Sequence, residues 1–202
     1  MQGLFITLEG VDGAGKSSHV EWLAEQFRQR GRCVRMTREP GGTAIGEQLR
    51  EIVLNQPMHP DTEALVMFAA RREHIDKVIQ PALDAGEVVI SDRFTDASFA
   101  YQCGGRGLSE VRLETLETWV QGNLQPNLTL LFDVPTEIAA SRLANARDPD
   151  RFEREQADFH ARVRQAYLRR AEKDSARIRI IDGSRNLEEV RAQLVAIMET
   201  IP

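Results

Sequence analysis

Several kinds of pattern are absent from this sequence of 202 residues, and each absence excludes a class of protein. The two cysteines, Cys33 and Cys103, lack the close spacing of metal ligands. No stretch approaches the roughly 18 consecutive apolar residues that span a membrane. The net charge of −5 argues against a general nucleic-acid-binding surface, which is normally basic. We therefore expect no membrane and no nucleic acid among the partners of this protein.

Internal repeats, low-complexity segments and linker-like stretches are absent as well. Apolar residues make up 42% of the chain and charged residues 28%, which are ordinary globular values. The length suits one domain with a substantial core, which we expect to span 1–202.

The most informative segment present is 10–17, with the sequence GVDGAGKS, which fits the phosphate-binding pattern G-x-x-x-x-G-K-[ST]. An apolar run at 4–8 predicts a strand before it, and helical spacing predicts a helix after it. The glycines let successive backbone N–H groups point at an anion, and the helix N-terminus adds its positive end. The lysine can reach the β- and γ-phosphates, and the serine can ligate Mg²⁺. The predicted donor-nucleotide residues are Gly10, Gly13, Ala14, Gly15, Lys16, Ser17 and Ser18.

Short apolar segments alternate with helical patterns along the whole chain. Strands are predicted at 4–9, 33–37, 87–91, 128–133 and 177–182. Helices are predicted near 16–30, 44–54, 62–85, 109–122, 136–145, 155–173 and 187–200. This alternation implies an α/β fold of the P-loop NTPase type, with a doubly wound sheet of five parallel strands covered by helices on both faces. Ligands of such folds bind at the carboxyl ends of the strands.

Local signals mark several helix ends. Asp61 and Ser109 are expected to be N-caps, and Asn186 with Glu189, three residues later, resembles a capping box. The long helix that precedes the third strand contains a proline at position 81, which is expected to kink or break it, and Gly86 is expected to end it.

Two charged residues directly follow the third apolar run. Asp92 lies where a carboxylate can hold Mg²⁺ or its waters opposite Ser17, and we favour this role over that of an ordinary helix cap. Arg93 can clamp a second phosphate group in a bidentate manner or form a surface salt bridge. The spacing alone does not decide between these two roles for Arg93.

Phe68 and Arg72 are four residues apart, so on a helix they are expected to share one face. An aromatic ring beside a guanidinium group can stack on a base while the guanidinium binds the edge of that base. The alternative is that Phe68 is a core residue in line with Leu65 and Ile75, while Arg72 is solvated. Periodicity alone favours the alternative.

An arginine-rich segment at 142–154 joins two predicted helices, and Pro149 with its flanking aspartates makes part of it a loop. As a lid, this segment could exclude water and stabilise charge on a transferring phosphoryl group. The alternative is a solvated connection. Gly13 favours the lid, because the phosphate-binding loop has no arginine of its own and the cation has to come from elsewhere.

No residue stands out as a general base. The histidines are scattered, at His19, His59, His74 and His160. The sequence also has no Asp-x-x-x-x-Asn catalytic loop of the protein-kinase type. A phosphate monoester has a second pKa of about 6, so it is largely dianionic at neutral pH and needs no base to activate it. The pattern therefore fits a kinase that acts on a monophosphate by positioning and electrostatics.

Four segments together resemble the thymidylate kinase family. They are EGVDGAGKS at 9–17, TREPGGT at 37–43, MFAARR at 67–72, and DRF at 92–94 followed by Ser98 and by AYQ at 100–102. The resemblance runs through nearly the whole chain in motif order, and its second and fourth segments are more specific than the phosphate-binding loop. Gly13 and the arginines of 142–154 resemble the form of the family that carries its arginines in the lid.

The resemblance implies roles for residues around the acceptor, dTMP. Phe68 would stack on the thymine ring and Arg72 would hydrogen-bond to its edge. Ser98 would lie near a ring nitrogen. Tyr101 would lie near the sugar and disfavour a 2′-hydroxyl, and Gln102 would line the same pocket.

The resemblance also implies how the phosphates are held. Arg38 and Arg93 would hold the acceptor phosphate, Asp12 would contact the 3′-hydroxyl, and Glu39 would lie near the same pocket. Arg142 would lie against the donor adenine, and the expected lid cations are Arg147 and Arg151. Together with Lys16 and Arg93, these two lid arginines form the predicted catalytic set.

The expected activity is in-line transfer of a phosphoryl group from ATP to dTMP, with Mg²⁺ bridging the donor phosphates and no covalent intermediate. The first rival is another nucleoside monophosphate kinase or a deoxynucleoside kinase of the same fold. A P-loop switch protein is disfavoured because no Asn-Lys-x-Asp segment is present. We expect a cytoplasmic protein, since the chain enters a strand without a leader pattern, and the family implies a homodimer.

Overall fold

A sheet of five parallel strands forms the centre of the computed structural model, which describes residues 2–143 and 150–201. The strands are β1 (Leu4–Glu9), β2 (Val34–Arg38), β3 (Val88–Asp92), β4 (Leu128–Asp133) and β5 (Ile178–Asp182), in the order β2-β3-β1-β4-β5. The inner strands are buried along nearly their whole length, as in a sheet that is covered on both faces. The predicted fold class is confirmed.

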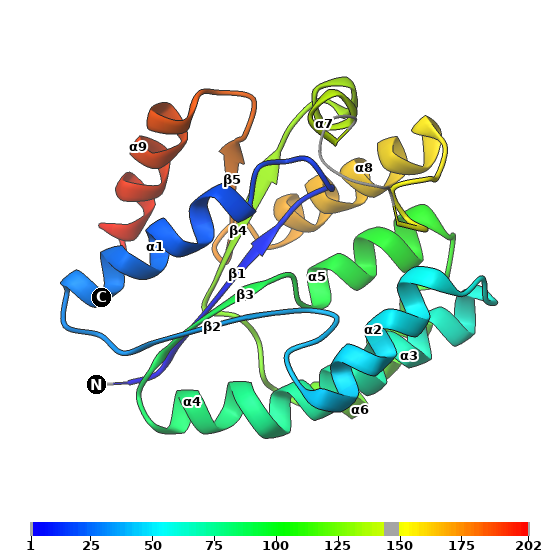
Figure 1. Ribbon diagram of the computed structural model, residues 1–202, viewed down its shortest axis with the longest axis horizontal. Helices are drawn as coiled ribbons and strands as arrows, with labels where there is room; N and C mark the ends of the chain where they lie inside the picture. The colour runs from blue at the N-terminus through cyan, green and yellow to red at the C-terminus, as the bar shows by residue number, and fades with distance from the viewer. Residues whose placement is uncertain (1, 144–149, 202) are drawn as a thin grey trace.

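Helices cover both faces of the sheet (Figure 1). On one side lie α1 (Ser17–Gln29) and α9 (Leu187–Met198). The other side carries α3 (Pro60–His74), α4 (Gln80–Asp84), α5 (Thr95–Ser98), α6 (Glu110–Gln121) and α8 (Ala157–Lys173), with α2 (Ala44–Asn55) packed against α3. The remaining helix, α7 (Thr136–Leu143), follows β4 at the carboxyl edge of the sheet. None of the helices in the described ranges is both long and apolar enough to cross a membrane.

The predicted helix at 62–85 is continuous through its proline and does not break there. A π-helical turn, η1 (Ile75–Ile79), joins α3 to α4, and the N–H of Gln80 donates to the carbonyl of Ile75 five residues earlier. Pro81 is the second residue of α4 and directly follows the π-helical turn, whose irregular hydrogen bonding accommodates the missing N–H within the continuous helix. Gly86, in the left-handed region at φ 77°, follows the helix end as predicted.

One of the predicted helix caps, Asp61, is wrong, and the others occupy the predicted positions. The N-cap of α3 is His59, whose Nδ1 accepts from the N–H of Asp61, so Asp61 is not the cap. Pro60 takes the first helical position and thereby moves the helix start two residues earlier than predicted. Ser109 is the N-cap residue of α6, as predicted, but its side chain forms no capping hydrogen bond. The capping box of Asn186 and Glu189 is confirmed.

The sequence predictions missed the helical segment after β3. There α5 runs directly into a second π-helical segment, η2 (Phe99–Gly105), and most of both segments is buried. Buried on nearly all sides, they lack the polar face that makes a helix recognisable from its periodicity. This segment carries three predicted site residues, Ser98, Tyr101 and Gln102, toward the carboxyl edge of the sheet.

Candidate active site

The phosphate-binding loop connects β1 to α1 and packs closely against α7. Gly13 lies at φ 80°, and a Cβ atom there would overlap the backbone carbonyl of Ala139 in α7. Both the backbone conformation and the close approach therefore require glycine. No arginine can occupy position 13 while α7 lies where it does.

Lys16 is folded back onto its own loop. Its Nζ donates to the carbonyl oxygens of Gly10 and Val11 at 3.0 and 3.1 Å, and the residue is buried. Burial and the nearby Arg93 lower the pKa of Lys16, while Asp92 and Asp12 oppose that shift. The ammonium group therefore lies among the charged groups at the strand ends.

A cavity of about 190 Å³ lies along the loop on the side that faces α9, and four of its lining residues belong to the predicted donor set. These are Ala14, Gly15, Ser18 and Arg142. The guanidinium of Arg142 crosses the loop, donating to Gly13 O at 3.4 Å and to Gly183 O at 3.0 Å. Arg185 and Leu187 also line this cavity and were missed by the sequence analysis, which found no motif after β5.

The two predicted metal ligands lie at the start of α1 and at the end of β3. Ser17 is the first residue of α1 and is exposed. Asp92 ends β3, and its Oδ1 is buried with no hydrogen-bond partner in the described ranges. No cluster of three or more His, Cys, Asp or Glu side chains suited to a metal occurs in those ranges. This donor set matches Mg²⁺, which keeps several waters and is bound mainly by phosphates with one or two protein oxygens.

Arg93 turns toward the phosphate-binding loop and is largely buried, which excludes the surface salt bridge considered above. It is a non-glycine residue at φ 72°, and this backbone turn directs its side chain to the loop. The guanidinium donates to Gly10 O at 2.9 Å, to Asp12 Oδ1 at 2.7 Å and to the hydroxyl groups of Tyr101 and Tyr167.

Asp12 receives hydrogen bonds from both sides of this cluster. Tyr101 donates to Asp12 Oδ2 at 2.9 Å, opposite the contact with Arg93. Burial opposes the ionisation of Asp12, but Arg93 and Lys16 outweigh burial and hold the pKa of this carboxyl well below its usual range. Asp12 is therefore a fixed anion between the loop and the acceptor cavity.

A second carboxyl group, Glu9, is linked to Arg93 through the hydroxyl group of Tyr167 and was not among the predicted site residues. Glu9 is completely buried at the end of β1 and accepts from Phe94 N at 2.7 Å and from the Tyr167 hydroxyl at 2.8 Å. Burial, reinforced by the nearby Asp96, raises the pKa of Glu9 to about 8. Glu9 was quoted in the sequence motif, but a strand-end glutamate gives no sign of its burial.

Five predicted acceptor residues line one cavity at the carboxyl edge of the sheet. They are Asp12, Glu39, Arg93, Tyr101 and Gln102. The same cavity is lined by residues that the sequence analysis missed, namely Arg50, Met67 and Phe152. These five predicted residues thus come together from the phosphate-binding loop, the β2–α2 loop, the end of β3 and η2.

Neither residue of the predicted base-binding pair, Phe68 and Arg72, lines the acceptor cavity. Phe68 is 1% exposed in an apolar cluster with Phe99 and Leu113, and it does not line the acceptor cavity. Arg72 is half-exposed, and its Nη1 donates to Val120 O at 2.8 Å at the contact between α3 and α6. The alternative considered for Phe68, a core residue, is the arrangement that the structure has.

The buried arginine of α3 is Arg71, one residue earlier. Its Nε donates to Glu39 Oε2 at 2.8 Å and its Nη2 to Ser98 Oγ at 3.0 Å, while the guanidinium lies 4.5 Å from the centre of the Phe68 ring. Its Nη1 is buried and has no hydrogen-bond partner in the described part of the chain. Four residues before Arg71 on the helix lies Met67, which lines the cavity in place of Phe68.

Three guanidinium groups, of Arg38, Arg50 and Arg93, lie near one another at this cavity. Arg50 lines it and donates to Pro40 O at 2.9 Å. Burial lowers the pKa of Arg50, and repulsion from Arg38 and Arg93 lowers it further. Arg38 itself is half-exposed and paired with Glu47 at 2.8 Å. Mutual repulsion among cations is relieved by a dianion, so this arrangement suits a phosphate group.

The two predicted lid cations fare differently. Arg147 lies outside the described residues. Arg151 lies on the acceptor side, where its Nε donates to Val53 O at 3.0 Å and its Nη2 to Glu63 Oε2 at 2.6 Å. In this arrangement Arg151 binds α2 and α3 and does not reach the phosphate-binding loop, contrary to the expectation of a cation on the transferred group.

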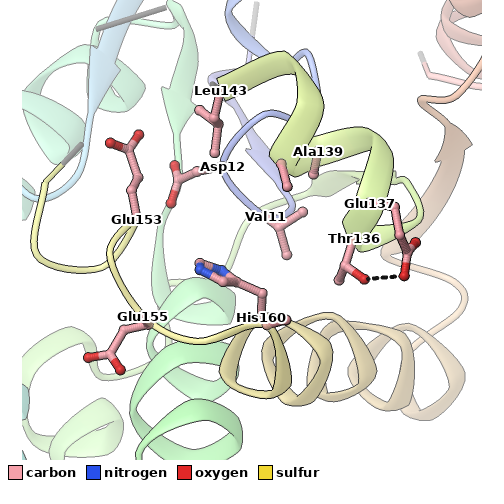
Figure 2. Close-up of a pocket in the computed structure, with 11 residues that line it drawn as sticks. Val11, Asp12, Thr136, Glu137, Ala139, Leu143, Glu153, Glu155 and His160 are labelled. Carbon is pink, nitrogen blue, oxygen red and sulfur yellow. Dashed lines mark hydrogen bonds between the residues drawn. The ribbon is translucent and has the colours of Figure 1, made fainter. Parts of the chain in front are cut away.

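The largest cavity found in the described ranges, about 560 Å³, lies between α7 and the N-terminal part of α8. Figure 2 shows Val11, Ala139 and Leu143 above it and His160 below, with the carboxylates of Asp12, Glu153 and Glu155 around it. Asp12 is the only residue of this cavity that belongs to the predicted acceptor set. The predicted acceptor residues converge in the smaller cavity instead.

Comparisons with known proteins agree with this geometry. The family model described as thymidylate kinase matches residues 8–194. Two relatives named thymidylate kinase, from Cupriavidus metallidurans and Methylobacillus flagellatus, are each 60% identical to this chain, with alignments covering 100% and 98% of both sequences respectively. A crystal structure of thymidylate kinase from Ehrlichia chaffeensis superposes with a TM-score of 0.80 at 30% identity, covering 98% of this chain and 99% of that one.

Proposed function

Because this chain belongs to the thymidylate kinase family and phosphorylates dTMP to dTDP, we propose how its residues divide that reaction among them. The proposal rests on one observation above all. Two buried polar atoms beside the acceptor site, Arg71 Nη1 and Gln102 Oε1, have no hydrogen-bond partner in the described ranges. A buried polar atom without a partner costs about 1–3 kcal/mol, so such a pair points to a ligand that supplies both partners.

Thymine carries a matching edge. Its O4 accepts a hydrogen bond and the adjacent N3–H donates one, so that Arg71 Nη1 would bind O4 and Gln102 Oε1 would bind N3–H. Met67 and Phe152 supply apolar walls for the ring. We therefore assign the edge-reading role to Arg71 in place of Arg72, and a stacking role to Met67 and Phe152 in place of Phe68.

The sugar and phosphate would follow along the same cavity. Asp12, fixed by Arg93 and Tyr101, is placed to accept from the 3′-hydroxyl. Arg93 and Arg50 would hold the acceptor phosphate, joined by Arg38 once it leaves Glu47. This places the attacking phosphate oxygen next to the loop that holds the donor.

The donor side needs positive charge and little covalent chemistry. Lys16 would exchange its two loop carbonyls for phosphate oxygens of ATP, and Arg142 would cover the adenine. Mg²⁺, held by Ser17 and through water by Asp92, would neutralise charge on the donor phosphates. We further propose that 142–154 acts as a lid and that Arg147 supplies its cation.

The neighbouring arginines of α3 give a matched test of the base-reading role. We expect Arg71→Ala to raise the dissociation constant of dTMP by roughly ten- to a hundredfold, which corresponds to about 1–3 kcal/mol for an unpaired buried partner. Arg72→Ala also removes a guanidinium group, but from a half-exposed position, and it is expected to change dTMP affinity less than about twofold. Calorimetric titration of each variant with dTMP, and with ATP to verify the fold, measures both. A larger effect at Arg72 would refute the assignment.

Two further properties belong to this proposal. A homodimer would form through α3 and α6, because Leu65, Val111 and Trp119 are exposed there beside an apolar groove of about 310 Å³. A cytoplasmic location agrees with the two free cysteines, Cys33 and Cys103, which a reducing compartment preserves.

A further inference from the structure

A buried carboxylate, Glu63, lies between the acceptor cavity and the arginine-rich segment that follows α7. It belongs to the first turn of α3 and is completely buried. Three side chains donate to it. Gln102 Nε2 lies 2.8 Å from Oε1, while Arg106 Nε and Arg151 Nη2 lie 3.3 and 2.6 Å from Oε2.

Two guanidinium groups form ion pairs with Glu63. The carboxylate that Arg106 and Arg151 contact offers lone pairs and no hydrogen to donate. The amide of Gln102 has one donor end and one acceptor end of nearly equal size. Against a carboxylate only the NH₂ end forms a hydrogen bond, so the oxygen end is turned the other way.

The other end of that amide belongs to the acceptor site. Gln102 lines the acceptor cavity, and its Oε1 is buried without a partner in the described part of the chain. An acceptor atom held in this position favours a base with an N–H group at ring position 3, as in thymine or uracil. Cytosine carries a lone pair at that position, which would face the lone pairs of Oε1.

We propose that Glu63 determines which pyrimidine this kinase accepts, by holding Gln102 in the orientation that presents Oε1 to the base. Glu63 is a positioning residue, since it acts through Gln102 and does not touch the base. The inference rests on the proposed base-reading role of Gln102.

The test compares dTMP with dCMP as acceptors in Glu63→Gln. A glutamine at this position can donate as well as accept, so the amide of Gln102 is free to invert and present NH₂ to the base. We expect the ratio of kcat/KM for dTMP to kcat/KM for dCMP to fall at least about tenfold, because a site that hydrogen-bonds its substrate derives its selectivity from that contact. The full-length chain is assayed with ATP and Mg²⁺.

A matched control is available on α2. Glu51 accepts from the side-chain amide of Asn55 at 2.8 Å, but it is exposed. Glu51→Gln makes the same chemical change to a carboxylate–amide contact away from the cavity, and we expect its acceptor ratio to equal that of the unaltered enzyme. An equal loss of efficiency for dTMP and dCMP in Glu63→Gln would overturn the inference, because it would show a merely structural role. An unchanged ratio would overturn it as well.

Glu63→Asp keeps the test valid if Glu63→Gln does not fold. The shorter carboxylate still neutralises the two arginines but withdraws its oxygen from Gln102, so we expect the acceptor ratio to fall here too. A ratio equal to that of the unaltered enzyme would count against the inference. The underlying base-reading role of Gln102 is tested separately with Gln102→Ala. If this variant keeps the preference for dTMP over dCMP, Gln102 does not read the base.

Discussion

At the scale of single residues, the site depends on carboxyl groups whose ionisation the fold sets in opposite directions. Asp12 is held as an anion by Arg93 and Lys16. Glu9, a few residues earlier on the same strand and loop, is buried beside Asp96, and its pKa is raised to about 8. Because the protonated form of Glu9 is neutral, it adds no further negative charge to the buried groups near Arg93.

This difference predicts a pH dependence of stability. Between the ordinary pKa of Glu9, near 4.5, and its folded value of about 8, the folded state binds a proton that the unfolded state does not. Glu9 therefore makes stability fall as pH rises through that range. We expect the free energy of unfolding of Glu9→Gln to depend less on pH. Between pH 5 and pH 8 the unaltered protein should lose about 1–3 kcal/mol more stability than this variant. Urea denaturation across this range measures it, and parallel curves for the two proteins would contradict it.

At the scale of elements, the contact between α7 and the phosphate-binding loop can be tested with two glycines. Gly13 and Gly31 both have positive φ, at 80° and 76°, but a Cβ atom at Gly31 meets nothing within 4 Å. Gly31→Ala thus measures backbone strain alone, expected at about 1–2 kcal/mol. Gly13→Ala adds the clash with Ala139 and is expected to cost about 2–4 kcal/mol. Denaturation midpoints give both values, and equal losses would mean that the α7 contact adds nothing.

The elements also show what sequence could and could not predict. The strands, the phosphate-binding loop and the strand-end residues Asp92 and Arg93 were all predictable, because buried parallel strands and glycine turns have distinctive local patterns. The rotation of α3 about its own axis, which decides which of its residues face the cavity, was not predictable. In the sequence MFAARR at 67–72, two large apolar residues are followed by two alanines and two arginines, so a four-residue spacing from apolar residue to arginine occurs in two registers, one residue apart. Only the tertiary packing of Phe68 against α6 and η2 selects the register in which Met67 lines the cavity and Arg71 is buried against Glu39, which also lines it.

At the scale of the whole molecule, the proposed dimer face lies on the opposite side of the sheet from α9 (Figure 1). Trp119 on α6 is 79% exposed, whereas Val195 on α9 is 38% exposed. An exposed tryptophan beside an apolar groove has the character of an interface anchor. We expect Trp119→Glu to weaken self-association at least about tenfold, because a charge would have to be buried at the interface. Val195→Glu places the same charge on the other side of the sheet and is expected to leave the assembly unchanged. Analytical ultracentrifugation over a range of concentrations measures both, and a Trp119→Glu protein that associates as strongly as the unaltered one would place the interface elsewhere.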